Sequence, residues 1–180
     1  MKRSILLSAM VILSVCLNAQ FKTASLQATG LTCAMCSNAI NKALQAKPFI
    51  MSVKADIKNS AFSIVFKENA DVDIDEIRKA VEDAGFGVGS LKLTGNFKEV
   101  KIGNDSHVQI GDRQFHFLNV SDQLLNGEQT ITIIDKDFLT AKQFKKFNET
   151  TKMKCLQSGK ASACCPPGVT AGTRIYHVTI

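Results

Sequence analysis

The sequence predicts an α+β fold in two parts, a mixed segment of strands and helices followed by a β-rich segment. In the first part, apolar residues recur at strand and helix spacings in the order strand, helix, strand, strand, helix, strand. In the second part, short apolar or alternating runs are separated by Gly-Asn, Gly-Asp and Asn-Gly pairs. Short apolar runs separated by such turn signals are typical of a small β-sheet or barrel.

Ahead of both parts, the N-terminal residues have the composition of a secretory signal peptide. Lys2 and Arg3 form a positive n-region, residues 5–15 are apolar, and Ala19 is a small residue suited to cleavage. We therefore expect residues 1–19 to be removed and the protein to be exported, to a periplasm or to the extracellular space.

Cys16 offers a second interpretation of this segment. Residues 13–16 loosely resemble a bacterial lipoprotein signal, in which the cysteine carries a lipid anchor. Val15 stands where such signals usually have Gly or Ala, so a cleaved signal is the favoured prediction.

The composition of the remaining chain argues against nucleic-acid binding and against a transmembrane span. The formal net charge of +6 falls to about +4 without the signal, because Lys2 and Arg3 leave and no acidic residue leaves with them. Both signs are mixed along the chain, without a basic block interleaved with aromatics, so nucleic acid is not expected. No later stretch approaches the ~20 apolar residues that a transmembrane span requires.

Residues 20–94 are predicted as one domain. A short strand at 23–30 is followed by a helix that ends before Pro48. Residues 52–57 and 61–66 alternate on either side of a Lys-Asn-Ser turn and predict two strands.

A second helix, within residues 71–85, and a strand at 88–93 complete this domain. The helix has Ile74, Ile77 and Val81 on one face and acidic residues in its first turn. The order βαββαβ is the ferredoxin-like arrangement, in which two helices cover one face of a four-stranded antiparallel sheet.

Residues 95–180 are predicted as a small β-rich domain, barrel- or sandwich-like, with one helix. A change of period near Gly95 marks its start. The helix is predicted to begin at Asp137 as N-cap, with an apolar stripe that ends at Phe147 and packs in the core. The predicted strands are 97–102, 107–110, 115–120, 128–134 and 174–180.

Cys33 and Cys36 form a CxxC pair between the first strand and the first helix. A helix N-terminus offers unpaired N–H groups and a positive dipole end, which stabilise thiolates. Thiolates bind soft metal ions such as Cu(I), Hg(II) and Zn(II) in preference to hard cations. A closed structural zinc site needs four ligands, and no nearby pair supplies the other two. Two thiolates on an exposed loop therefore favour a metal carrier.

The run GLTCAMC at residues 30–36, followed by Ile40 and by EDAGFG at 82–87, resembles the heavy-metal-associated domain. This family includes copper chaperones, the metal-binding domains of copper-transporting ATPases and the periplasmic mercury-binding protein. The resemblance covers roughly residues 23–94. It implies that Cys33 and Cys36 ligate the metal, with Cu(I) as the first expectation.

The resemblance also places residues beside the metal. It implies that Thr32 and Phe86 are adjacent to the site, with Phe86 where the family has a loop aromatic or a lysine. Leu31 replaces the usual methionine, which packs inward, and leucine should substitute for it with little effect.

Other uses of the CxxC pair remain open. A disulfide between Cys33 and Cys36 is accessible in an oxidising compartment, but so short a ring constrains little chain. A thiol–disulfide oxidoreductase also carries CxxC at a helix N-terminus, although in a different order of elements. Binding of mercury or zinc is a further alternative.

A second group of thiols lies near the C-terminus. Five cysteines would remain after cleavage, and an odd number in an exported protein leaves at least one thiol free, metal-bound or intermolecular. The favoured interpretation is a disulfide from Cys155 to Cys164 or Cys165, worth ~3 kcal/mol in the chain-entropy model. The alternative is a second soft-metal site of these three thiols, completed by Met153 or His177.

The remaining polar residues are interpreted as structural. His107 and His116 lie in predicted strands and are expected to be ordinary strand residues. The acidic residues Asp71, Asp73, Asp75 and Glu76 are expected to serve the dipole of the second helix. No hydrolase, zinc-protease or phosphate-loop motif is present, so we expect a binding protein and not an enzyme.

Taken together, the sequence predicts an exported Cu(I) chaperone or buffer. The metal would pass by ligand exchange, an incoming ligand adding while one cysteine leaves. The expected partners are the metal ion and a protein that donates or accepts it.

Overall fold

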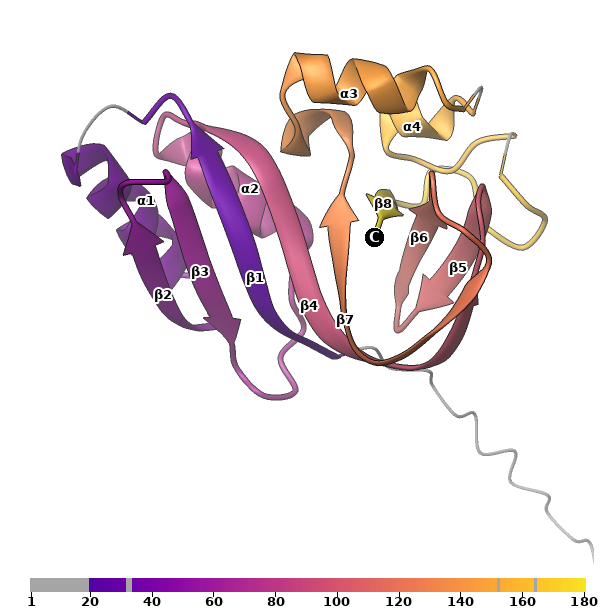
Figure 1. Cartoon of the computed structure of the whole chain (residues 1–180), viewed down its shortest axis with the longest axis horizontal. Coiled ribbons are helices and arrows are strands. Elements are labelled where there is room, and N and C mark those ends of the chain that lie inside the picture. The colour runs from indigo at the N-terminus through magenta and orange to yellow at the C-terminus, as the bar shows by residue number, and fades with distance from the viewer. Residues whose placement is uncertain (1–19, 32–33, 152, 164) are drawn as a thin grey trace, which may run out of the picture.

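The first half of the chain folds in the predicted order of strands and helices (Figure 1). The structure is a computed structural model and describes residues 20–31, 34–151, 153–163 and 165–180, so the predicted signal peptide and the lipid-anchor alternative lie outside the described residues. The elements of this half are β1 (Gln20–Thr29), α1 (Ala34–Gln45), β2 (Ile50–Asp56), β3 (Ala61–Phe66), α2 (Ile74–Asp83) and β4 (Gly87–Ile102).

These elements form the predicted ferredoxin-like layer. The strands pair antiparallel in the order β2-β3-β1-β4. The helices α1 and α2 lie together on one face of the strands in Figure 1. They do so because each carries an apolar stripe, exemplified by Ile40 and Leu44 on α1 and by Ile77 and Val81 on α2, all 0% exposed.

The second half extends the same sheet and does not start a separate barrel or sandwich. Its strands join at the free side of β4, so that the whole sheet has the order β2-β3-β1-β4-β7-β8-β6-β5. The pair β6–β8 is parallel, and the pairs β4–β7, β7–β8 and β5–β6 are antiparallel. How the chain divides into domains stays a prediction, since β4 runs through residues 94 and 95 without a break. The elements of this half are β5 (Ser106–Ile110), β6 (Arg113–Phe117), β7 (Gln123–Ile133), η1 (Lys136–Phe138), α3 (Ala141–Asn148), α4 (Cys155–Ser158) and β8 (Ile175–Thr179).

A bulge between β4 and β7 corrects two of the sequence expectations. The strand predicted at 97–102 is the end of β4, and the Asn126-Gly127 pair lies inside β7 instead of forming a turn. The register shifts between Phe97 and Val100, opposite Gly127 and Leu125. Gly127 has φ +71°, a left-handed conformation that glycine adopts at little cost. Bulges bend strands, and β4 and β7 curve together toward the second half in Figure 1.

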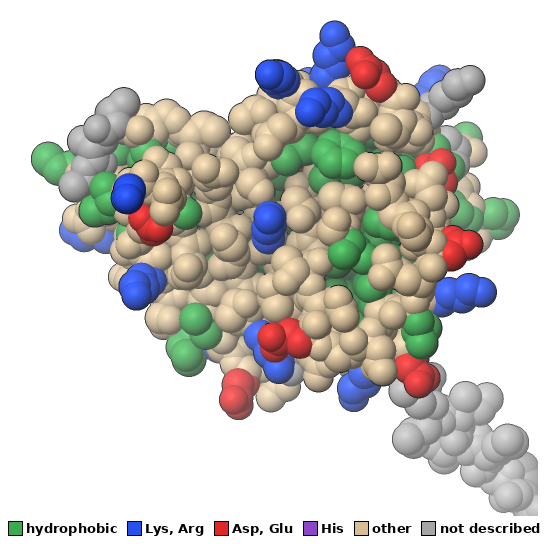
Figure 2. All heavy atoms as spheres, viewed as in Figure 1, with side chains coloured by type: hydrophobic (Ala, Val, Ile, Leu, Met, Phe, Trp, Pro, Cys, Tyr) green, Lys and Arg blue, Asp and Glu red, His purple; other side chains and the backbone are tan. Residues whose placement is uncertain are grey.

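The helical part of the second half also differs from the prediction. Asp137 lies within the 3₁₀ turn η1, and the cap of α3 is Thr140, which forms a capping box with Gln143. This box satisfies both the Gln143 and the Thr140 backbone N–H groups, so the helix begins three residues later than predicted. The short α4 adds a second helix where the prediction had one. The outer face of α3 carries lysines, and Figure 2 shows them gathered over this helix.

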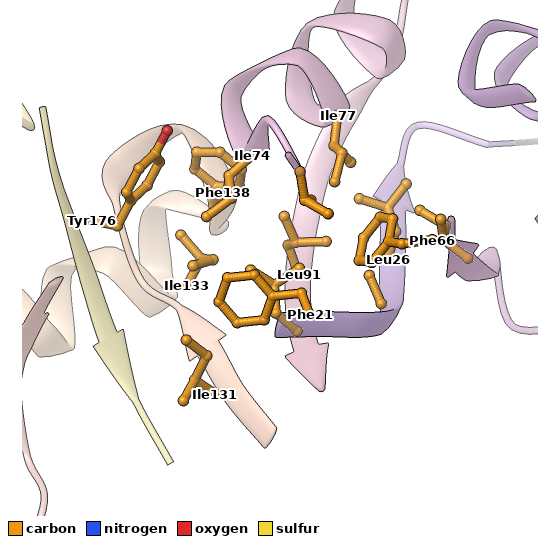
Figure 3. Packing of buried hydrophobic residues seen from close by; sticks show 14 of the residues in the cluster. Phe21, Leu26, Phe66, Ile74, Ile77, Leu91, Ile131, Ile133, Phe138 and Tyr176 are labelled. Carbon is orange, nitrogen blue, oxygen red and sulfur yellow. The ribbon is translucent and has the colours of Figure 1, made fainter. Parts of the chain in front are cut away.

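One hydrophobic core joins the two halves. The ring of Phe21 on β1 meets Phe97 and Phe115 edge-on, at centroid distances of 6.3 and 6.2 Å. Figure 3 shows side chains of both halves in one packing, with Leu91 of β4 beside Phe21 and with Ile133 of β7 between Phe21 and Tyr176. Two smaller clusters lie under α3 and α4. No helix in the described ranges is long and apolar enough to cross a membrane.

An ion-pair network ties α2 to the second half. Arg174 donates to both carboxylate oxygens of Asp75, at 2.9 and 3.1 Å, and the Tyr176 hydroxyl donates to Oδ2 of Asp75 at 3.0 Å. The helix start is also acidic as predicted, since Oδ1 of Asp73 caps α2 by accepting from the Glu76 N–H at 3.0 Å and Asp75 and Glu76 lie in its first turn. Burial by itself would raise the pKa of Asp75, but the hydrogen bonds and charge of Arg174 outweigh it and hold this pKa below its ordinary value of 3.8.

The network predicts a specific pH dependence of stability. Because the pKa of Asp75 is lower in the folded than in the unfolded chain, its contribution is present above the unfolded pKa and is lost as pH falls through the folded pKa. Asp75→Asn should lower the free energy of unfolding at pH 7 by about 1–2 kcal/mol and should flatten the loss of stability on acidification. Urea unfolding of both proteins at neutral and acid pH checks this.

The control is Glu128→Gln, which removes an exposed pair with Lys22 at 3.5 Å. That change should cost less than ~0.5 kcal/mol at either pH, because exposed ion pairs contribute little. The prediction would be contradicted by an Asp75→Asn variant that has the same free energy of unfolding at pH 7 and loses it on acidification as the unchanged protein does.

The shared core predicts that a single substitution in the second half weakens the first half as well. Phe115 on β6 is 0% exposed, so Phe115→Ala should cost about 3–5 kcal/mol. Hydrogen exchange should show earlier opening of β1 and β4 in this variant, whereas Leu124→Ala at a 55% exposed position should change neither. Destabilisation confined to β5–β8, with β1 protected as before, would show that the halves unfold independently.

Candidate metal-binding sites

The predicted CxxC site lies where β1 meets α1. Thr32 and Cys33 lie outside the described residues. Cys36 falls in the first turn of α1 and is half-buried, next to Met35, which is 84% exposed. The backbone N–H groups of a helix's first turn lack intrahelical partners and favour an anion nearby. Cys36 therefore lies beside these N–H groups at the start of α1.

Three described residues, Gly30, Leu31 and Phe86, lie at or beside this loop. Gly30, with φ +81°, turns the chain from β1, and a Cβ placed on it would lie 3.9 Å from the Phe86 ring. Phe86 therefore borders the loop from the end of α2, while Leu31 packs inward against the core. The functional roles of Cys33, Cys36, Thr32 and Phe86 stay predictions.

The three histidines of the chain lie side by side on neighbouring strands of the second half. In the register of the sheet, His107 of β5 faces His116 of β6, and His116 faces His177 of β8. Facing residues put their side chains on the same side of a sheet. The rings of His107 and His116 stack at a centroid distance of 4.0 Å, and His177 meets His116 edge-on at 5.0 Å.

The thiol of Cys155, at the start of α4, lies over this row and is 0% exposed. Its Sγ is 3.4 Å from Nε2 of His177 and 3.9 Å from Nδ1 of His116. One ligand atom each of His107, His116 and Cys155 lies within 4.8 Å of the others. The second half thus gathers four donor residues from three strands and a helix.

Two carboxylates hold two of these rings from behind. Oδ1 of Asp135 lies 2.6 Å from Nδ1 of His177, and Oδ1 of Asp105 lies 3.2 Å from Nε2 of His116. Asp135 also accepts from the His177 backbone N–H and pairs with Arg174 at 2.8 Å. A carboxylate accepts the ring proton, so in each neutral ring the other nitrogen faces Cys155 with its lone pair.

Burial keeps the central ring neutral. The pKa of His116 is lowered to about 3, mainly by burial and then by the charges of His107 and His177. Burial also lowers the pKa of His107, and the charge of His177 adds to that effect. Neutral imidazole is the form that binds metal ions.

The other cysteines of the predicted second cluster lie elsewhere or outside the description. Cys164 lies outside the described residues, so a disulfide to it stays a prediction. Cys165 is free and half-buried, so the Cys155–Cys165 pairing is not formed. Met153 and Cys165 are partly buried beside the cluster that contains Cys155.

Sequence reasoning missed the grouping of His107 and His116 with Cys155. The prediction that they are ordinary strand residues is incomplete, since both are strand residues but they face each other and a buried thiol. The available signal was one histidine in each of three predicted strands. That signal becomes informative only when the strands are known to be neighbours in register.

The comparisons with known proteins concern the first half. Residues 25–87 match the family model of the heavy-metal-associated domain. Over 76 residues the chain is 34% identical to the probable copper-transporting ATPase HMA5 of Arabidopsis thaliana, and over 57 residues it is 35% identical to a copper-transporting ATPase of Helicobacter pylori. These stretches are 42% and 32% of this chain, and each is 8% of the relative.

Solved structures of this domain type are also similar. The copper-binding domain of HMA7, a P-type ATPase, is 28% identical, with a TM-score of 0.35, over 40% of this chain and 92% of that domain. The family match at residues 25–87 confirms the heavy-metal-associated domain that the sequence predicted. The chain spans only 8% of the length of the ATPases it matches, so the similarity belongs to this domain and not to their transport machinery.

Proposed function

We propose that the protein is an exported carrier of a soft metal ion, Cu(I) in the first place, bound between the thiolates of Cys33 and Cys36. The observation that carries this proposal is the heavy-metal-associated domain at residues 25–87, which contains both cysteines of the motif. The named relatives are copper-transporting ATPases, which supports copper ahead of mercury and zinc. The protein is proposed to bind and transfer, and not to act as an enzyme.

The local structure supports a site that can release its ion. Cys36 is half-buried at the start of α1, and Met35 beside it is exposed to solvent. Two thiolates leave Cu(I) with low coordination, so an incoming thiolate or thioether can add to the ion before one cysteine leaves. The incoming ligand and the leaving thiolate exchange places without any redox change. This ligand exchange would hand the ion to or from a partner protein.

The rigid part of the site comes from the helix that follows it. Ile40 and Leu44 anchor α1 in the core, each at 0% exposure. Export follows from the predicted signal at residues 1–19 and is part of the proposal. Outside the cytosol, early loading with metal would keep the two thiols from forming a disulfide.

An anaerobic Cu(I) titration of the reduced protein against a competing chelator tests the proposal. The double variant Cys33→Ser/Cys36→Ser should lose about one equivalent of tightly bound Cu(I), because both thiolate ligands are removed. Cys165→Ser is the matched control, since it removes a free, half-buried thiol elsewhere and should leave this equivalent in place.

Equal Cu(I) binding by the double variant and the control would overturn the proposed site. A protein that binds no Cu(I) competitively but turns over a disulfide substrate would instead be a thiol–disulfide oxidoreductase. Binding of Hg(II) or Zn(II) without Cu(I) would keep the site and replace its metal.

A further inference from the structure

The second half brings together a set of donors that the heavy-metal-associated domain does not contain. Strand pairing lines up His107, His116 and His177, and α4 places the Cys155 thiol over the row. His116, His177 and Cys155 are each 0% exposed. Buried polar groups are costly unless they have partners, and the two ring nitrogens of His107 have no hydrogen-bond partner among the described residues.

The orientation of the other two rings indicates what kind of ligand this cluster can bind. Asp105 and Asp135 occupy Nε2 of His116 and Nδ1 of His177, which leaves the opposite nitrogen of each ring directed at Cys155. In metal sites a ligating histidine usually donates its other ring N–H to a carboxylate, which fixes the tautomer and the ring orientation.

The two distances from the Cys155 sulfur fit a tetrahedral ion. Typical bonds of about 2.3 Å to sulfur and about 2.0–2.1 Å to nitrogen separate the two donor atoms by roughly 3.5 Å at a tetrahedral angle. The observed separations of Cys155 Sγ from His177 Nε2 and His116 Nδ1 are 3.4 and 3.9 Å. The His107 donor lies within 4.8 Å of the other two, and neither of its buried ring nitrogens has a hydrogen-bond partner among the described residues.

We propose that Cys155, His107, His116 and His177 form a second, buried metal site for a transition-metal ion of the class of Zn(II) and copper. One thiolate with three imidazoles suits these borderline ions and does not suit Mg²⁺ or Ca²⁺, which prefer oxygen ligands. Binding releases the thiol proton to solvent, and the bound ion cross-links β5, β6 and β8 to α4. This site is separate from the CxxC pair and does not depend on the carrier function.

A catalytic thiol is the competing interpretation of part of this cluster. Cys155, His177 and Asp135 have the connectivity of a thiol–imidazole–carboxylate triad. A nucleophile must reach its substrate, however, and Cys155 is fully buried. The triad also leaves His107 and His116 without a role, whereas a metal uses all four donors.

The test uses the reduced full chain carrying Cys33→Ser/Cys36→Ser, so that the carrier site cannot contribute. Zn(II), Cu(I) and Co(II) are each titrated under anaerobic conditions against a competing chelator, and Co(II) is also followed by its visible thiolate charge-transfer band. About one equivalent of Zn(II) or Cu(I) should bind, and Zn(II) should protect Cys155 from alkylation.

Three further substitutions in that background identify the ligands. Cys155→Ser should abolish the Co(II) charge-transfer band and weaken binding, and Asp135→Asn should weaken binding roughly 10–100-fold by releasing His177. Cys165→Ser is the matched control and should change neither property. Circular dichroism and thermal melts without metal verify that each variant is folded.

Several results would overturn the proposal. A folded background protein that binds none of the three ions would remove the site. Binding that is lost in Cys165→Ser but kept in Cys155→Ser would assign it to other ligands. A Cys155–Cys164 disulfide found by mass spectrometry of the native protein would exclude the thiolate ligand. Rapid alkylation of Cys155 that Zn(II) does not slow would favour the catalytic thiol.

Discussion

The pairing of β4 with strands on both of its sides is the constraint on which the rest of the molecule depends. With 16 residues, β4 is long enough to complete the ferredoxin-like layer beside β1 and then to pair with β7 along its other edge. A strand edge left open would expose unpaired N–H and C=O groups. Because β7 covers that edge, the four strands of the ferredoxin-like layer become half of an eight-stranded sheet.

This continuity places the two candidate sites on one rigid framework. The CxxC loop follows β1, one strand away from β4 on one side, and the histidine row lies on β8, β6 and β5, beyond β7 on the other side. The core that includes Phe21, Phe97 and Phe115 spans the junction, and the Asp75–Arg174 pair fastens α2 to the start of β8. On this framework Cys36 is half-buried at the start of α1, whereas Cys155 is fully buried over the histidine row.

The two sites also differ in what they can do with a metal ion. Two thiolates beside an exposed residue leave an ion open to exchange, which suits a carrier. Three imidazoles and a thiol, buried and backed by Asp105 and Asp135, would surround an ion and hold it. The second arrangement therefore suits a structural or storage role, with the ion tying α4 to the strands beneath it.

The sequence by itself determined the first half well. Periodicities of two and of three to four depend on neighbours along the chain, so β3 was predicted at its observed bounds, and the Asp73 cap of α2 lay inside the predicted acidic turn. The motif around Cys33 and Cys36 is likewise local, and it predicted the heavy-metal-associated domain. Two local patterns gave wrong predictions. Asn126-Gly127, a turn signal, lies inside β7 opposite the bulge of β4, and the N-cap of the helix is Thr140 instead of Asp137.

Only the tertiary structure decided how the second half is arranged. Whether His107, His116 and His177 meet depends on which strands are neighbours and in what register, and a shift by one residue would turn a histidine to the other face of the sheet. The parallel pairing of β6 with β8 joins segments about 60 residues apart, and the burial of Cys155 depends on α4 packing over them. Such contacts follow from the global packing of apolar faces, which no short stretch of sequence contains.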